Sequence, residues 1–213
     1  MAIMATDTGG GSDFTPVPAG THFAVCDQVV DLGKQRIVSQ MYGESIKHQV
    51  YIRWQIPAER VEWEKEGQKH EGPAVIGKTY TVSLSDKANL RKDLQSWRTK
   101  PFTPDELRGF DIAKLLGVPA TLTVTHTEKD GKTYANVASL GGIPKGMPKP
   151  ELEGEAILYD SENMGSIERL SPKMQERIKA QILDERTASQ PGNDPDAWRG
   201  GGFGEDLDDD IPF

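Results

Sequence analysis

The residues at the C-terminal end of the sequence combine charge and apolar side chains in an order suited to capture by another protein. Three aspartates, Asp208 to Asp210, are followed by Ile211, Pro212 and Phe213. Aspartates keep such a segment in solvent, while the apolar residues form a plug that a hydrophobic pocket with a basic rim could accept. A merely solubilising tail would explain the aspartates but not the apolar ending. We therefore interpret this segment as a protein-docking tip made of Asp208, Asp209, Asp210, Ile211, Pro212 and Phe213.

The docking tip, with Glu205, Asp206 and Leu207 before it, resembles the C-terminal tip of bacterial single-stranded DNA-binding proteins. The resemblance is short, but the motif requires a specific order of residues and an apolar ending. It implies that the tip docks replication and repair enzymes. It also implies an OB-fold core, because proteins with this tip are OB-fold proteins.

A second group of residues has the chemistry needed to bind single-stranded DNA. Such binding needs cations that follow the phosphates and flat rings on which bases stack. In an OB-fold the usual contact surface is the outer face of strands 2 and 3 with the loops between strands 1 and 2 and strands 4 and 5. The candidate residues on this surface are Tyr51, Arg53, Lys34, Arg36, Tyr42, Lys47, Lys129, Lys132 and Tyr134. Each has a structural alternative, since a tyrosine could be packing and a lysine could be solvated charge.

The sequence lacks the motifs of an enzyme. The histidines do not have the spacing of metal ligands, and neither a Gly-rich phosphate loop nor a nucleophile motif is present. Acidic residues that could bind Mg²⁺ cluster in the tail, where an unfolded chain would not hold a fixed octahedral site. We therefore expect no catalysis, no metal and no cofactor. A nuclease built from separate carboxylates that converge in space stays an alternative.

The negative charge of the chain belongs to its C-terminal third. The whole chain has a net charge of -8, but residues 1–150 contain 19 Lys and Arg against 17 Asp and Glu, whereas residues 151–213 contain 6 against 16. A nearly neutral core can still present a basic groove to nucleic acid. The single cysteine, Cys26, excludes an intramolecular disulfide and lies in an apolar strand pattern, which indicates a buried thiol in a reducing cytosol.

Alternating apolar residues predict five strands, and the clearest alternation is Val50, Ile52, Trp54 and Ile56. The expected strands are Thr21 to Asp31, Gln49 to Ile56, Lys78 to Leu84, Ala120 to His126 and Thr133 to Leu140. The polar segment Lys34 to Lys47 reads as a loop or the irregular tip of a hairpin. Glu59 to Gly77, which contains Trp63, reads as a long connection.

Helix signals lie between the third and fourth strands and again near the C-terminus. Ser85 could cap a helical region running to about Leu116, in which Thr103 and Glu106 form a capping box. Asp130-Gly131 predicts the turn between the last two strands. Ser171 and Pro172 predict the start of an amphipathic helix with Met174, Ile178 and Ile182 on one face, which we expect to pack on the barrel.

These elements predict a mainly β protein: a five-stranded OB-fold Greek-key barrel with a helical segment between strands 3 and 4, a C-terminal helix and a disordered acidic tail. The expected organisation has four parts. They are a flexible arm over 1–18, the OB-fold domain over 19–150, an extension over 151–186, and a disordered linker with the docking tip over 187–213.

The middle of the chain carries a second resemblance. Several short motifs resemble a family of bacteriophage proteins assigned as single-stranded DNA-binding or replication-accessory proteins. The motifs are Asn89-Leu90-Arg91-Lys92, Ser96-Trp97-Arg98, Phe102-Thr103, Gly109-Phe110-Asp111-Ile112, Lys114-Leu115-Leu116-Gly117-Val118-Pro119 and Pro144-Lys145-Gly146-Met147. The similarity covers most of residues 17–150. It implies fold and lineage and assigns no contact residue.

Together the resemblances imply a phage protein in the cytoplasm of the infected bacterium. It would coat and protect single-stranded DNA during replication, recombination and repair, and recruit enzymes through its tip. A protein-interaction module that captures host replication proteins without binding DNA would explain the tail equally well. The basic and aromatic candidates favour DNA binding over that alternative.

Overall fold

The computed structural model of the chain describes residues 15–39, 43–65, 67–160 and 164–182. Tyr42, the docking tip and most of the predicted N-terminal arm lie outside the described residues. Within the described part, strands account for most of the regular structure. The fold is therefore mainly β, as the sequence predicts.

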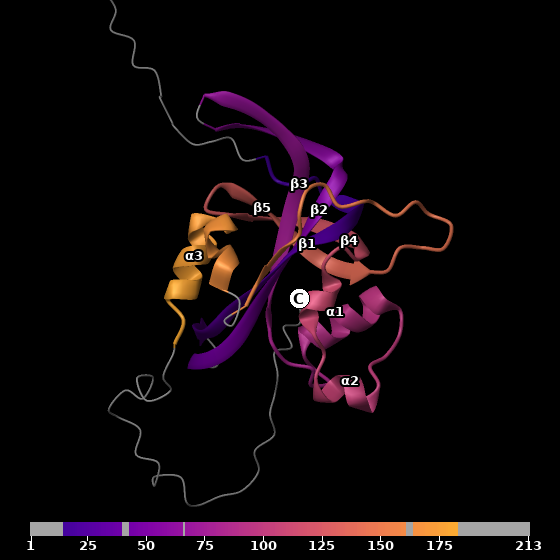
Figure 1. Cartoon of the computed structure of the whole chain (residues 1–213), viewed down its shortest axis with the longest axis vertical. Coiled ribbons are helices and arrows are strands. Elements are labelled where there is room, and N and C mark those ends of the chain that lie inside the picture. The colour runs from indigo at the N-terminus through magenta and orange to yellow at the C-terminus, as the bar shows by residue number, and fades with distance from the viewer. Residues whose placement is uncertain (1–14, 40–42, 66, 161–163, 183–213) are drawn as a thin grey trace, which may run out of the picture.

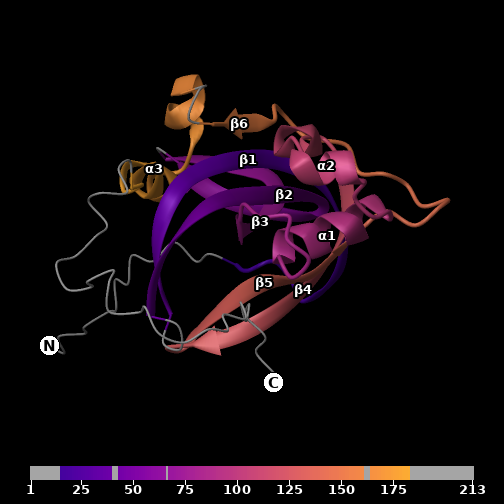
Figure 2. The ribbon, with the colours of Figure 1, turned by 90° about the horizontal axis from the view of Figure 1, so that it is seen from below.

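The strands form one curled antiparallel sheet with the order β3-β2-β1-β4-β5. The bounds are Gly20–Ser39 for β1, Gly43–Lys65 for β2, Gln68–Thr81 for β3, Pro119–Lys129 for β4 and Lys132–Gly141 for β5. Figure 2 shows β1, β2 and β3 arching over one side of the molecule while β4 and β5 lie on the other. The sheet thus curls into a half-barrel around its apolar core.

The core explains why these strands curl around one space. Ile52, Trp54 and Ile56 project inward from β2 and are buried, as the alternation in the sequence predicts. Helix α1, Asn89–Arg98, lies at one end of this space (Figures 1 and 2). Its Leu90, Leu94 and Trp97 are buried against the core. The rings of Trp54 and Trp97 lie 5.7 Å apart. One apolar cluster therefore joins the sheet to the helix.

Cys26 lies inside this core with no exposed surface, so the prediction of a buried thiol is confirmed. Burial, with the neighbouring Asp27 carboxylate as a second cause, raises the pKa of the Cys26 thiol to about 12. The thiol therefore stays protonated at neutral pH, and its role is packing.

The predicted helical region between β3 and β4 is broken into three short pieces. They are α1, α2 at Pro104–Arg108, and the 3-10 helix η1 at Ile112–Leu115. The capping box of Thr103 and Glu106 is confirmed. Ser85 as the cap of the first helix is wrong, because α1 begins after Ala88.

The segment from Glu59 to Gly77 is not a connection, as the sequence suggested, but the paired arms of a long β2–β3 hairpin. Lys65 of β2 pairs with Gln68 of β3, and the register shifts between Ile56 and Arg60. This irregularity accommodates Pro57, which has no N–H to donate to a regular ladder. The strand therefore continues beyond Ile56, where the sequence predicts its end.

Trp63 lies near the tip of this hairpin and is 47% exposed. Its ring stacks on His70 of the neighbouring strand at 5.8 Å between ring centroids. Gly72 lies beneath the tryptophan, because a Cβ at that position would approach the ring to 2.9 Å. The residue thus rests on β3 and stays outside the apolar core.

The segment Lys34 to Lys47 is a more regular hairpin than the sequence indicated. β1 and β2 pair from Lys34 with His48 to Ser39 with Gly43. A register shift between Asp31 and Gly33, where Gly33 has a φ of 66°, precedes this regular arm. The irregularity therefore lies before the arm and not within it.

The β4–β5 hairpin closes as the sequence predicts. Asp130 and Gly131 have φ values of 53° and 72°, the combination that a two-residue type I′ turn requires. Lys129 and Lys132 on either side of the turn are direct cross-strand partners.

The C-terminal part of the described chain packs on the outside of β1, as expected for its helix. Strand β6, Ile157–Tyr159, pairs in parallel with β1, and helix α3, Pro172–Lys179, begins after Ser171 (Figure 2). A second apolar cluster joins these elements and contains Val30, Leu32, Tyr159, Leu170 and Ile178. None of the helices in the described part of the chain is long and apolar enough to cross a bilayer.

Substitution of Gly77 in β3 tests the packing of Tyr51, whose ring contacts the second apolar cluster. A Cβ at position 77 would overlap the ring of Tyr51, whereas a Cβ at Gly109 would meet no atom within 4 Å. Gly77→Ala should therefore lower the free energy of unfolding by about 1 to 3 kcal/mol, as overpacking does. Gly109→Ala is the matched control, since its φ of −178° suits any residue. Urea denaturation followed by circular dichroism measures both variants, and equal stabilities would contradict this packing.

Candidate functional site

Tyr51 lies on the outer face of β2, where its ring packs against the second apolar cluster. The side chain is half-buried and lies over Gly77. Burial raises the pKa of its hydroxyl. A base could stack here only on the part of the ring that this packing leaves open. Base stacking on Tyr51 stays a prediction beside the structural role that the contacts support.

Arg53 also lies on the outer face of β2, where its guanidinium binds the carboxylate of Asp27. Nη2 donates to Asp27 Oδ2 at 2.6 Å, and Nε donates to both carboxylate oxygens at 3.1 Å. The Asp27 side chain is only 2% exposed, against 27% for Arg53. A phosphate at Arg53 would have to compete with this buried carboxylate. Contact of Arg53 with DNA stays a prediction.

Arg177 of α3 is a cation on the same face that the sequence reasoning missed. Its guanidinium donates to Gln49 Oε1 at 3.0 Å and to Thr79 Oγ1 at 3.3 Å. Burial lowers its pKa. The signal in the sequence was its position three residues after Met174 and one before Ile178, which places it at the edge of the apolar face of the helix.

The candidates of the first hairpin do not form one site. Lys34 is exposed on β1, and Arg36 is ion-paired with the exposed Glu44 across the hairpin. Lys47 of β2 makes no ion pair with any of the described residues. These cations are spread along the two arms, so the hairpin offers separate charges.

The β4–β5 hairpin brings its three candidates together. Lys129 and Lys132 face each other at the turn, and Tyr134 lies two residues along β5, on the same face as Lys132. All three side chains are exposed, and Tyr134 is 48% exposed, so the alternative that it belongs to the core is excluded. Within the described residues, neither lysine forms an ion pair. We call Lys129, Lys132 and Tyr134 the hairpin site.

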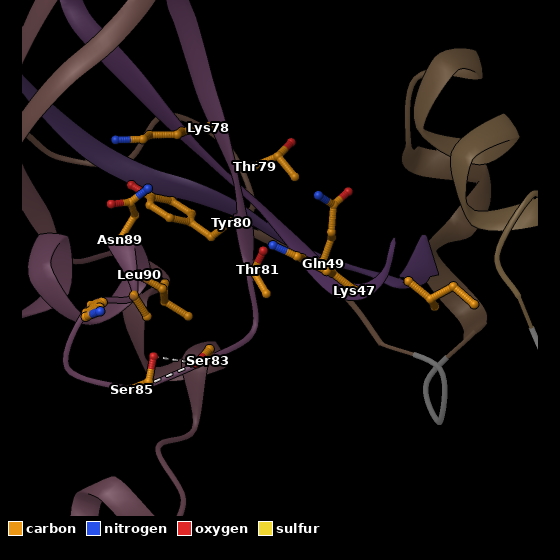
Figure 3. A pocket seen from close by; sticks show the side chains of 13 residues that line it. Lys47, Gln49, Lys78, Thr79, Tyr80, Thr81, Ser83, Ser85, Asn89 and Leu90 are labelled. Atoms are coloured by element: carbon orange, nitrogen blue, oxygen red, sulfur yellow. Dashed lines mark hydrogen bonds between the residues drawn. The ribbon is translucent and has the colours of Figure 1, made fainter. Parts of the chain in front are cut away.

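A hollow of about 470 Å³ opens where β2, β3 and the start of α1 meet. In Figure 3, Lys47 and Gln49 lie on one side of it, Asn89 and Leu90 on the other, and Thr81 between them. We call it the lysine hollow, and its lining is Ile46, Lys47, Gln49, Lys78, Thr79, Tyr80, Thr81, Ser83, Ser85, Lys87, Ala88, Asn89 and Leu90.

Only Lys47 of the lysine hollow was among the sequence candidates. Lys78 and Lys87 were missed, although Lys78 begins an alternating run of threonine and serine that ends at Ser85. The pattern of this run predicts only a strand and a helix cap. In space its hydroxyl groups line the hollow together with the three lysines.

Clusters that could hold a metal ion are absent from the described residues. The chain matches no protein-family model, and no curated protein is significantly similar to it in sequence.

Proposed function

We propose that this protein binds and protects single-stranded DNA during phage DNA replication, recombination or repair. The single observation that carries the proposal is the hairpin site, where an exposed ring lies beside two exposed lysines. Binding of single strands without sequence preference needs this combination of a stacking ring and phosphate-neutralising cations. The cytoplasm of an infected bacterium would be its place of action.

The electrostatic repulsion between Lys129 and Lys132 supports a role of this pair in binding phosphate. Like charges placed directly opposite each other across two strands destabilise the pair. Lys129 and Lys132 are in this position, and among the described residues neither has a carboxylate partner. A phosphate between them would turn the repulsion into attraction.

We further propose that the half-barrel is an OB-fold. Its strand order, β3-β2-β1-β4-β5, becomes that of the five-stranded barrel if the free edges of β3 and β5 meet. Helix α1 lies between β3 and β4 in the chain and covers one end of the core. In such a barrel the β4–β5 loop belongs to the usual nucleic-acid surface.

Recruitment of replication or recombination enzymes is the second part of the proposed function. It rests on the sequence of the docking tip, Asp208 to Phe213. A basic-rimmed apolar pocket on the partner would complement its charge and its apolar residues. The DNA site and the partner site would then be separate parts of one chain.

Binding of single-stranded DNA should exceed binding of duplex DNA of equal length and weaken as salt rises. Lys132→Ala should reduce the dependence of log K on log salt by about 0.7 if the lysine neutralises one phosphate. Tyr134→Ala should weaken binding by about 1 to 3 kcal/mol without changing that slope, because stacking involves no counterion release. Fluorescence anisotropy with labelled oligonucleotides at several salt concentrations measures all three quantities.

Two controls make this test specific. Tyr134→Phe keeps the ring and should bind like the wild type, and Lys100→Ala removes an exposed lysine remote in sequence from the hairpin. Equal or tighter binding to duplex DNA would refute the proposal. Enzyme capture without any binding of single strands would identify the protein-interaction module instead.

A further inference from the structure

We propose that the lysine hollow is a seat for one phosphate group of the bound strand, in addition to the contacts at the hairpin site. This inference rests on the proposed function, because the strand supplies the phosphate. The hollow brings together lysines from β2, β3 and the segment before α1, namely Lys47, Lys78 and Lys87. Three separate parts of the chain therefore converge on one cationic hollow.

The composition of the wall favours an anion. None of the lining residues is an aspartate or a glutamate. Hydroxyl groups of Thr79, Thr81, Ser83 and Ser85 and the side-chain amides of Gln49 and Asn89 add neutral hydrogen-bond donors. A hollow of about 470 Å³ is large enough for a ligand, and its polar lining suits a charged oxygen-rich group. The tetrahedral oxygens of a phosphodiester match both features.

The lysines of the hollow differ in how firmly they are held. Lys78 Nζ donates to Asp93 Oδ2 at 2.8 Å, and the Tyr80 hydroxyl donates to the same oxygen at 2.8 Å. Asp93 therefore holds Lys78 in place and offsets part of its charge. Lys47 makes no ion pair with the described residues, so its charge is not offset in this way. Lys47 is the lysine best placed to meet a phosphate.

The start of α1 adds to the positive character of this wall. Ala88 is the N-cap, makes no side-chain capping bond, and no acidic residue lies in the first turn. The amide groups at the start of a helix carry a partial positive charge that a capping residue or an acidic side chain usually satisfies. Ala88, Asn89 and Leu90 line the hollow, so these amides supplement the lysines.

The test is an NMR titration of the ¹⁵N-labelled full chain at constant ionic strength with three probes: inorganic phosphate, the dinucleotide dTpdT, and thymidine. Phosphate and dTpdT should shift the backbone amides of Asn89 and Leu90 saturably, whereas thymidine, which has no phosphate, should not. Lys47→Ala combined with Lys87→Ala should abolish these shifts. Lys100→Ala, which removes an exposed lysine outside the hollow, should leave them unchanged.

In parallel, the combined variant should reduce the salt dependence of single-strand binding by about 0.7 in log K per log salt, because the hollow would neutralise one phosphate. Unshifted amides, or shifts that persist in the combined variant, would overturn the inference. Shifts with inorganic phosphate but not with dTpdT would overturn the strand as the source of the phosphate. Single-strand binding that depends on Tyr134 and Lys132 but not on Lys47 and Lys87 would leave the proposed function intact while removing the phosphate seat.

Discussion

Arg53→Ala should lower the free energy of unfolding by about 3 to 5 kcal/mol, because it leaves a buried carboxylate without its partner. Asp27 is almost fully buried, and Arg53 supplies three hydrogen bonds to it. Without them the buried carboxylate loses its ionic partner and the three hydrogen bonds that offset its removal from water. Urea denaturation at neutral pH, followed by circular dichroism, measures the loss.

Two further variants show whether the unpaired charge causes this loss. Asp27→Ala combined with Arg53→Ala leaves no buried charge, so the double variant should be more stable than Arg53→Ala alone. Arg36→Ala removes an arginine from an ion pair with Glu44 in which both side chains are exposed, 40% and 45%, and should cost less than about 1 kcal/mol. A double variant that is no more stable than Arg53→Ala would show that the loss comes from packing.

Deletion of residues 206–213 should abolish capture of replication or recombination enzymes while the described fold stays stable. The deleted segment contains the whole docking tip, through which the protein contacts its partners in the proposed function. Under the proposed function, DNA affinity should stay equal or rise, because the acidic residues of the deleted segment would compete with phosphate for the DNA-binding lysines at low salt. A pull-down of host replication proteins and a DNA titration on the same variants measure both effects.

Point substitutions in the docking tip separate its charge from its apolar plug. Phe213→Ala keeps every carboxylate but empties the partner's pocket, and should weaken capture by about 2 kcal/mol or more. Replacing Asp208, Asp209 and Asp210 with asparagine keeps the plug and should make capture less sensitive to salt, because only Glu205 and Asp206 of the acidic run keep their charge. Undiminished capture by Phe213→Ala, or weaker DNA binding after the deletion, would refute the docking interpretation.

Local features of the fold could be predicted from the sequence because each depends on neighbouring residues. The alternation of Val50, Ile52 and Trp54 places one side of β2 in the core through the period of a strand. Asp130-Gly131 adopts the positive φ values that its turn requires, and the capping box at Thr103 forms within four residues. These elements need no information from distant parts of the chain.

Features that join distant segments could not be read in this way. Nothing local indicated that β2 would continue past Pro57, because the continuation depends on pairing with β3 and on a bulge that tolerates the proline. Strand β6 is only three residues long and is stabilised by its pairing with β1. Its apolar signal is too short to distinguish it from a loop.

The same distinction between local and distant features applies to the candidate site. The sequence by itself determined which residue types could meet DNA or a partner, including the paired lysines beside the β4–β5 turn and the apolar ending of the docking tip. Only the tertiary structure decided that Arg53 is ion-paired with the buried Asp27 and that Tyr51 packs against the second apolar cluster. It also decided that Lys47 lines the same hollow as Lys78 and Lys87, which lie far along the chain. The physical reason is that charge and ring type belong to single residues, whereas burial and ion pairing depend on which distant segments the folded sheet brings into contact.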